Sequence, residues 1–152
     1  MKFVSLMVLF ILCHASFAGA TNAQFSCKSA SGRTLLEASV PGDFDEFEVD
    51  LAIDNEKVSW YSLLNQTTYQ MEENSHIYVL GSLKEGNYHF VIANQEGEEV
   101  LRFSAISSSI QLENSAYGER GSLQAKVYGQ DPRADKEWTP VITLNCDYSY
   151  EI

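Results

Sequence analysis

The chain has 152 residues and a net charge of −11, with 21 acidic side chains against 10 basic ones. This acidity argues against DNA, RNA and anionic membrane surfaces as partners, because the negative field of the protein repels polyanions. The length is enough for one domain with a substantial apolar core.

The first twenty residues have the three parts of a secretory signal peptide. Lys2 gives a positive start, an apolar run covers residues 3–13, and small residues dominate positions 15–20. The run is shorter than the roughly 20 apolar residues that a membrane-spanning helix needs. We therefore predict cleavage after Ala18 or Ala20, with the second preferred. The mature domain, residues 21–152, is then exported to the periplasm or the extracellular space.

Removal of this segment changes the charge and the cysteine count. Lys2 is its only charged residue, so 9 basic and 21 acidic side chains remain, a net charge of −12. Cys13 is also lost, which leaves Cys27 and Cys146 near the two ends of the mature chain. An even number of cysteines in an exported protein predicts a disulfide, here one that closes nearly the whole domain.

The mature sequence alternates with the period of β-strands. In the clearest example, Phe47, Val49 and Leu51 share one parity, while Glu48 and Asp50 share the other, which is typical of a half-buried strand. Predicted strands cover residues 24–28, 34–40, 47–53, 58–64, 76–83, 88–93, 99–106, 109–113, 122–129 and 141–150. Short strands separated by turn signals predict an all-β fold, a single antiparallel β-sandwich or small β-barrel of about 8–10 strands.

The same alternation places particular side chains inside. Cys27 and Cys146 fall on the apolar faces of the first and last strands, so we expect these strands to lie close together, because a disulfide requires Cα atoms within about 7 Å. In the fourth predicted strand, Trp60 is expected inside with Val58, which leaves Tyr61 on the outer face.

The sequence has no arrangement of residues that is typical of a catalytic or metal-binding site. The mature chain has two histidines, and the hairpin centred on residues 85–86 places His89 opposite Ser82, far along the strand from His76. No serine lies in a nucleophile-elbow motif, and no mature cysteine stays free. The acidic segments 43–46 and 131–135 lack the glycine and terminal glutamate of a calcium loop. We therefore predict no enzyme activity, no cofactor and no metal site.

The segment 130–140 is the longest polar connection in the predicted fold, and it joins the last two strands. It carries Asp131, Arg133 and Trp138. Loops on a rigid β scaffold are common binding sites, and tryptophan is enriched at interface hot spots. These three residues are our candidate recognition site. The alternative is that Trp138 folds back and covers one end of the core.

Three functions are compatible with these patterns. The first is a non-enzymatic binding or interaction module for an unknown protein or glycan. The second is a small barrel that carries an apolar ligand. The third is an outer-membrane β-barrel, because apolar residues alternate from Leu144 to the terminal Ile152 as in the last strand of such barrels. The other strands are short for a membrane barrel, so we do not expect membrane insertion.

Overall fold

The computed structural model describes residues 22–40, 47–62, 77–82, 88–131 and 136–151. The predicted signal peptide lies outside these ranges, and so do His76 and Arg133. These ranges contain ten strands, one at each predicted place: β1 (Ala23–Ser29), β2 (Thr34–Val40), β3 (Phe47–Ile53), β4 (Glu56–Ser62), β5 (Ile77–Ser82), β6 (His89–Ala93), β7 (Glu99–Ala105), β8 (Gln111–Ser115), β9 (Gly118–Asp131) and β10 (Lys136–Glu151). A single 3-10 turn, η1 (Ser107–Ser109), precedes β8. No helix in the described part of the chain has the length and apolarity to cross a membrane.

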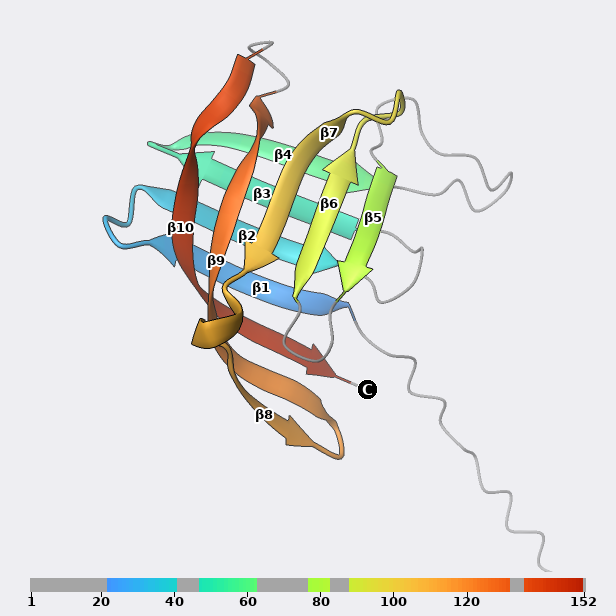
Figure 1. Ribbon diagram of the computed structural model, residues 1–152, viewed down its shortest axis with the longest axis vertical. Helices are drawn as coiled ribbons and strands as arrows, with labels where there is room; N and C mark the ends of the chain where they lie inside the picture. The colour runs from blue at the N-terminus through green and yellow to red at the C-terminus, as the bar shows by residue number, and fades with distance from the viewer. Residues whose placement is uncertain (1–21, 41–46, 63–76, 83–87, 132–135, 152) are drawn as a thin grey trace, which may run out of the picture.

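The strands form one antiparallel sheet that curls into a nearly closed barrel. Its order is β4-β3-β2-β1-β10-β9-β7-β6-β5, and β8 pairs with β9 outside this path. Figure 1 shows β1–β4 crossing behind β5–β7, which brings the two ends of the order near each other. Among the described residues, β4 and β5 approach without pairing, so the barrel is nearly closed. Of the two predicted architectures, the barrel is the one observed.

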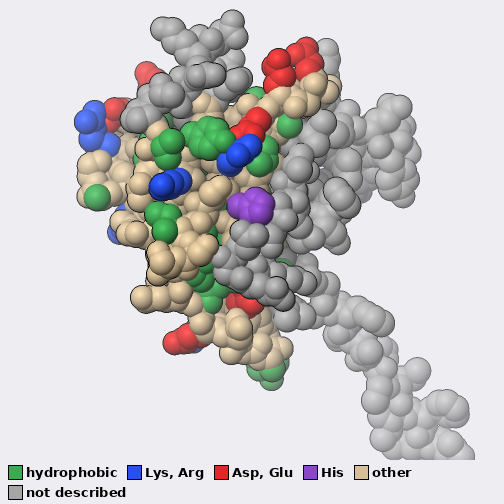
Figure 2. All heavy atoms as spheres, viewed as in Figure 1, with side chains coloured by type: hydrophobic (Ala, Val, Ile, Leu, Met, Phe, Trp, Pro, Cys, Tyr) green, Lys and Arg blue, Asp and Glu red, His purple; other side chains and the backbone are tan. Residues whose placement is uncertain are grey.

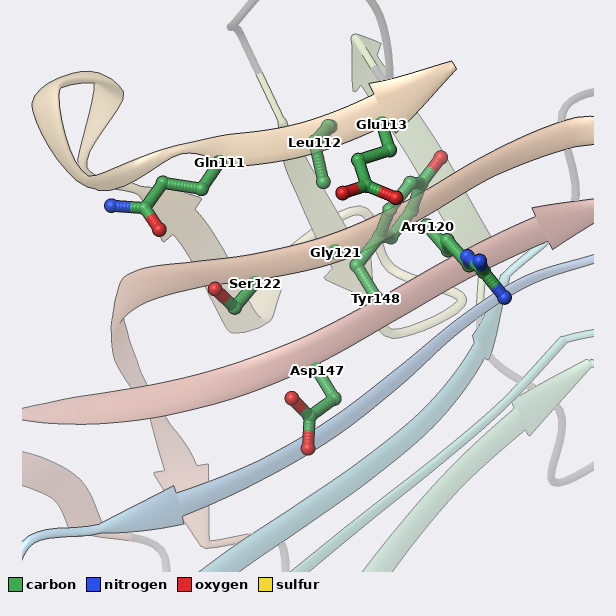
Figure 3. Close-up of a pocket in the computed structure, with 8 residues that line it drawn as sticks. All are labelled: Gln111, Leu112, Glu113, Arg120, Gly121, Ser122, Asp147 and Tyr148. Atoms are coloured by element: carbon green, nitrogen blue, oxygen red, sulfur yellow. The ribbon is translucent and has the colours of Figure 1, made fainter. Parts of the chain in front are cut away.

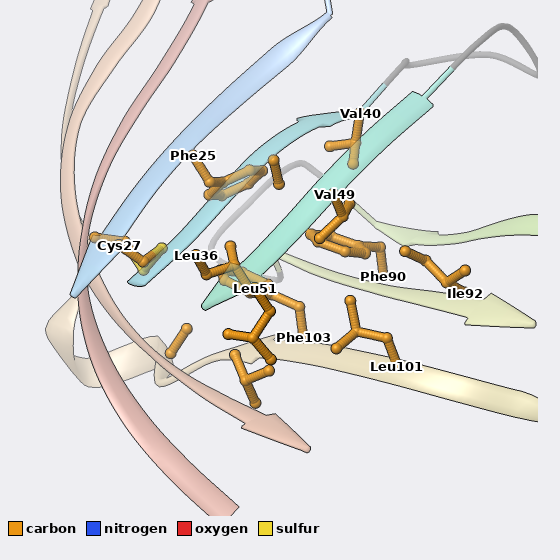
Figure 4. Close-up of a cluster of buried hydrophobic side chains, with 14 of the residues drawn as sticks. Phe25, Cys27, Leu36, Val40, Val49, Leu51, Phe90, Ile92, Leu101 and Phe103 are labelled. Atoms are coloured by element: carbon orange, nitrogen blue, oxygen red, sulfur yellow. A yellow bond between two sulfur atoms is a disulfide. The ribbon is translucent and has the colours of Figure 1, made fainter. Parts of the chain in front are cut away.

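The period-2 alternation accounts for the core. In β3 the buried positions are Phe47, Val49 and Leu51, and the acidic side chains between them face outward. Three phenylalanines from different strands meet at the centre: the ring of Phe25 lies 4.9 Å from that of Phe103 and 6.0 Å from that of Phe90. Figure 4 shows these rings among the aliphatic side chains of β2, β3, β6 and β7.

Two side-chain predictions hold in the structure. Trp60 is fully buried and Val58 nearly so, while Tyr61 is partly exposed. His89 is opposite Ser82 in the β5–β6 ladder, as the predicted hairpin requires. The other pairs of this ladder, from Leu80–Phe90 to Ile77–Ala93, differ from the predicted register by one residue, because the register shifts between Leu80 and Ser82.

The terminal strands are neighbours in the sheet, as expected. β1 pairs with β10, and Cys27 is directly opposite Cys146. Their Cα atoms are 4.0 Å apart and their sulfurs lie at disulfide distance, inside the barrel (Figure 4).

The last two strands are much longer than predicted. β9 has 14 residues and β10 has 16. Both extend into the segment 130–140, which the sequence predicts as a polar loop, and β9 also begins four residues earlier than predicted, at Gly118. One half of β9 pairs with β7 in the barrel, and the other half pairs with β8. Together with the last residues of β10, β8 and the first half of β9 form a three-stranded extension that leaves the barrel, seen at the bottom of Figure 1. We call this extension the wing.

Candidate functional site

Three adjoining hollows follow the outer face of the wing, and together we call them the trough. Their volumes are about 560, 590 and 480 Å³. Successive hollows share lining residues, so the trough is continuous along β8, β9 and β10. The lining side chains are mainly polar or charged: Lys28, Ser109, Gln111, Glu113, Asn114, Ser115, Glu119, Arg120, Ser122, Gln124, Asn145, Asp147, Ser149 and Glu151.

The strand register arranges these side chains in cross-strand rows. The first row runs from Gln111 through Ser122 to Asp147, across β8, β9 and β10. Glu113 and Arg120 are neighbours in the next row (Figure 3). Side chains in such rows stand about 4.5–5.5 Å apart at their Cβ atoms, so one polar ligand can contact several of them. In the described part of the chain, Arg120 belongs to none of the three ion pairs that the structure contains.

A glycine lets the strands of the wing approach each other. A Cβ atom at residue 121 would lie 2.1 Å from the carbonyl oxygen of Gln111 and 2.9 Å from the Cα atom of Leu112. Any side chain at this position would therefore push β8 away from β9, because both contacts are with backbone atoms. Gly121 thus sets the spacing of the strands that line the trough.

The far end of the trough is formed by the turn between β8 and β9. Tyr117 is 81% exposed there, the highest value among the large hydrophobic side chains of the described residues. Ser115 fixes this turn, because its hydroxyl accepts from the backbone N–H of Tyr117 at 3.1 Å and donates to the carbonyl of Gly118 at 3.1 Å. The turn therefore presents the exposed ring of Tyr117 at the edge of a polar surface.

The wing is anchored to the barrel by a buried aromatic cluster. The hydroxyl of Tyr88 donates a hydrogen bond to Glu119 Oε2 at 3.0 Å, which joins the start of β6 to the wing. The ring of Tyr148 lies 5.1 Å from that of Tyr88, edge to face, and both side chains are buried. Burial raises the pKa of both phenols above the ordinary value, and the nearby Glu119 carboxylate raises each pKa further.

The raised pKa values predict a loss of stability in alkali. An unfolded tyrosine ionises near pH 10, whereas these two stay protonated in the folded state well above that pH. Their contribution to folding is therefore complete below about pH 10 and falls as the pH rises from there towards the folded pKa values. A phenolate absorbance titration should show Tyr88 and Tyr148 ionising well above the ordinary tyrosine pKa. Replacing Glu119 with glutamine, which keeps an acceptor but removes the charge, should bring the ionisation of Tyr88 to lower pH. An unchanged titration curve would contradict the assignment of these phenols.

A second surface lies on the outer face of β6, β7 and β9. Arg102 stacks over the ring of Tyr128, with its guanidinium carbon 5.4 Å from the ring centroid, and it is also paired with Glu99. Lys126 and His89 lie on the same face, one row away. Figure 2 shows basic side chains and a histidine on this face, with acidic side chains gathered towards one end. The face thus offers positive charge.

The predicted recognition site is only partly described, and its extent is corrected. Asp131 is the last residue of β9, and its backbone pairs with Lys136 at the start of β10. Trp138 belongs to β10, where its backbone pairs with Gly129. The connection is therefore limited to residues 132–135, because backbone pairing between β9 and β10 continues through polar residues that carry no apolar alternation. Arg133 lies outside the described residues.

Sequence reasoning did not identify the trough. Residues 114–121, which form much of its lining, were predicted as a connection between the strands 109–113 and 122–129, and the only local signal was the pair of glycines Gly118 and Gly121 in that connection. In the described part of the chain, no group of three or more His, Cys, Asp or Glu side chains is placed to hold a metal ion. The trough therefore offers hydrogen bonds and charge. No protein-family model, no curated protein and no solved structure matches this chain.

Proposed function

We propose that this protein is an exported, non-enzymatic binding module that holds a polar ligand in the trough. The observation that carries the proposal is the continuous hollow surface on the wing, lined by rows of polar side chains with an exposed aromatic ring at its end. Export is proposed from the signal-peptide pattern of residues 1–20, and the cysteine pair is consistent with an oxidising compartment.

The form of the trough supports recognition of a polar partner. The rows present carboxylates, hydroxyls, amides and cations on a paired sheet, so their positions are set by backbone hydrogen bonds. Preorganised polar groups lower the entropic cost of binding. Tyr117 adds an amphipathic ring of the kind that is enriched at interface hot spots.

The test is to select ligands for the purified protein and to map where they bind. A displayed library of random linear peptides and an array of oligosaccharides would supply the probes. Substitution of Arg120 or Asp147 with alanine should weaken the selected ligand about tenfold or more, because each removes a charged hydrogen-bonding partner. The affinity would be measured by calorimetry, and the site by amide chemical-shift changes.

A matched control is available at an ion pair outside the lining of the trough. Arg33 and Asp54 form an exposed ion pair at the turns between β1 and β2 and between β3 and β4. Alanine at either position should leave affinity unchanged, because neither residue lines the trough. Shift changes confined to the face around Tyr128, with no effect of the trough variants, would show that the proposal is wrong.

A further inference from the structure

β8 has one edge that no described strand covers. It pairs with β9 along its whole length, and within the described ranges no strand pairs with its other side. Figure 1 shows β8 at the outer margin of the wing. An exposed edge of this kind is a template on which another extended chain can add a strand.

The register identifies the backbone groups that this edge presents. Ser115 and Gly118 close a two-residue hairpin, so they form a hydrogen-bonded pair, and such pairs alternate along an antiparallel ladder. Glu113 and Gln111 therefore bond to β9, while the N–H and C=O groups of Leu112 and Asn114 point away from it. The close approach of the Gly121 backbone to Leu112 agrees, because non-hydrogen-bonded pairs are the closer ones.

The position of the trough favours a peptide as the occupant of this edge. Side chains of β8 alternate, so Gln111, Glu113 and Ser115 face the trough, whereas Leu112 packs against the core. A peptide strand paired with β8 would therefore place every second side chain at the border of the trough and the others next to Leu112.

The charges define which peptide fits. The outward rows of the trough carry three carboxylates, Glu113, Asp147 and Glu151, against the two cations Lys28 and Arg120, since Glu119 is turned to Tyr88 on the barrel side. A lysine or arginine opposite Glu113 would form a cross-strand pair of opposite charge. The net charge of −12 on the mature chain would also attract a basic segment. A second copy of this chain fits poorly, because symmetric pairing of two β8 edges sets Glu113 against its own counterpart.

We propose, on the basis of the proposed function, that the ligand of the trough is an extended basic peptide segment that adds a strand to β8. Its backbone bonds to Leu112 and Asn114, and its cationic side chains lie along the trough. The probe is a capped pentapeptide of alternating lysine and valine, with lysine at both ends and in the centre.

Asn114 provides a variant that blocks strand addition without disturbing the wing. Proline at this position removes the N–H that points away from β9, and proline is tolerated on such an edge. We expect Asn114→Pro to weaken peptide binding about tenfold or more, whereas Asn114→Ala, which keeps the N–H and removes only the side chain, should weaken it much less. The amides of Leu112 and Asn114 should become protected from hydrogen exchange when the peptide binds. A peptide with glutamate in place of lysine should not bind.

Three other outcomes would overturn strand addition, the peptide assignment or the trough itself as a binding site. Equal binding to the proline and alanine variants would overturn strand addition while leaving the trough as a binding site. Failure of the peptide, with an oligosaccharide mapping to the trough, would overturn the peptide assignment and keep the proposed function. No ligand mapping to the trough at all would overturn both.

Discussion

Replacing Cys27 and Cys146 together with alanine is expected to lower the free energy of unfolding by about 5 kcal/mol. The two cysteines are 119 residues apart in sequence, so the bond restricts nearly the whole unfolded domain. The loss is large compared with the roughly 5–15 kcal/mol by which a typical domain is stable. Urea unfolding of the oxidised protein and of the double variant would measure it.

The choice of alanine isolates the cross-link. Both cysteines are buried, so serine would also bury a hydroxyl, whereas alanine removes the bond without adding a polar group. Reduction of the wild-type protein supplies an independent comparison and should cost a similar free energy. If the oxidised protein and the double-alanine variant unfold at the same urea concentration, the cysteines are not bonded in the folded protein.

Replacing Phe25 with alanine is expected to cost about 3–5 kcal/mol. Its side chain is almost completely buried, and its ring lies 4.9 Å from the rings of both Phe103 and Tyr148. Truncation leaves a cavity where strands from both sides of the barrel meet, so the surrounding rings cannot close it without moving the backbone. The unfolding midpoint in urea should fall while the slope of the transition stays unchanged.

Phe25→Leu is the matched control for this cavity. Leucine keeps most of the buried volume and loses only the aromatic contacts, so we expect a cost below about 1.5 kcal/mol. Because Tyr148 also packs against Tyr88, the alanine variant should weaken the anchoring of the wing as well. Equal stability of the alanine and leucine variants would show that the ring cluster is not a tightly packed core.

Local alternation was enough to predict the strands and their inner faces. Trp60, Val58 and the apolar side of β3 were assigned correctly because the side-chain period of a strand is two, whatever its neighbours are. The proximity of the terminal strands was predicted from Cys27 and Cys146, because a disulfide between them requires two residues far apart in the sequence to be in contact. His89 was placed opposite Ser82 because a short turn determines the register of its hairpin.

Tertiary structure determined how the barrel closes and where the wing leaves it. Pairing between β9 and β10 continues through polar residues, and β9 changes partner from β8 to β7 along its length, which no periodic pattern predicts. The trough exists because Gly121 lets the wing strands approach closely and because the Tyr88–Glu119 hydrogen bond holds the wing to the barrel. Which side chains face inward could thus be predicted locally, because it depends on residues two positions apart in the chain. Only long-range hydrogen bonds between strands decided where the sheet curls, where it leaves the barrel and which polar rows lie side by side.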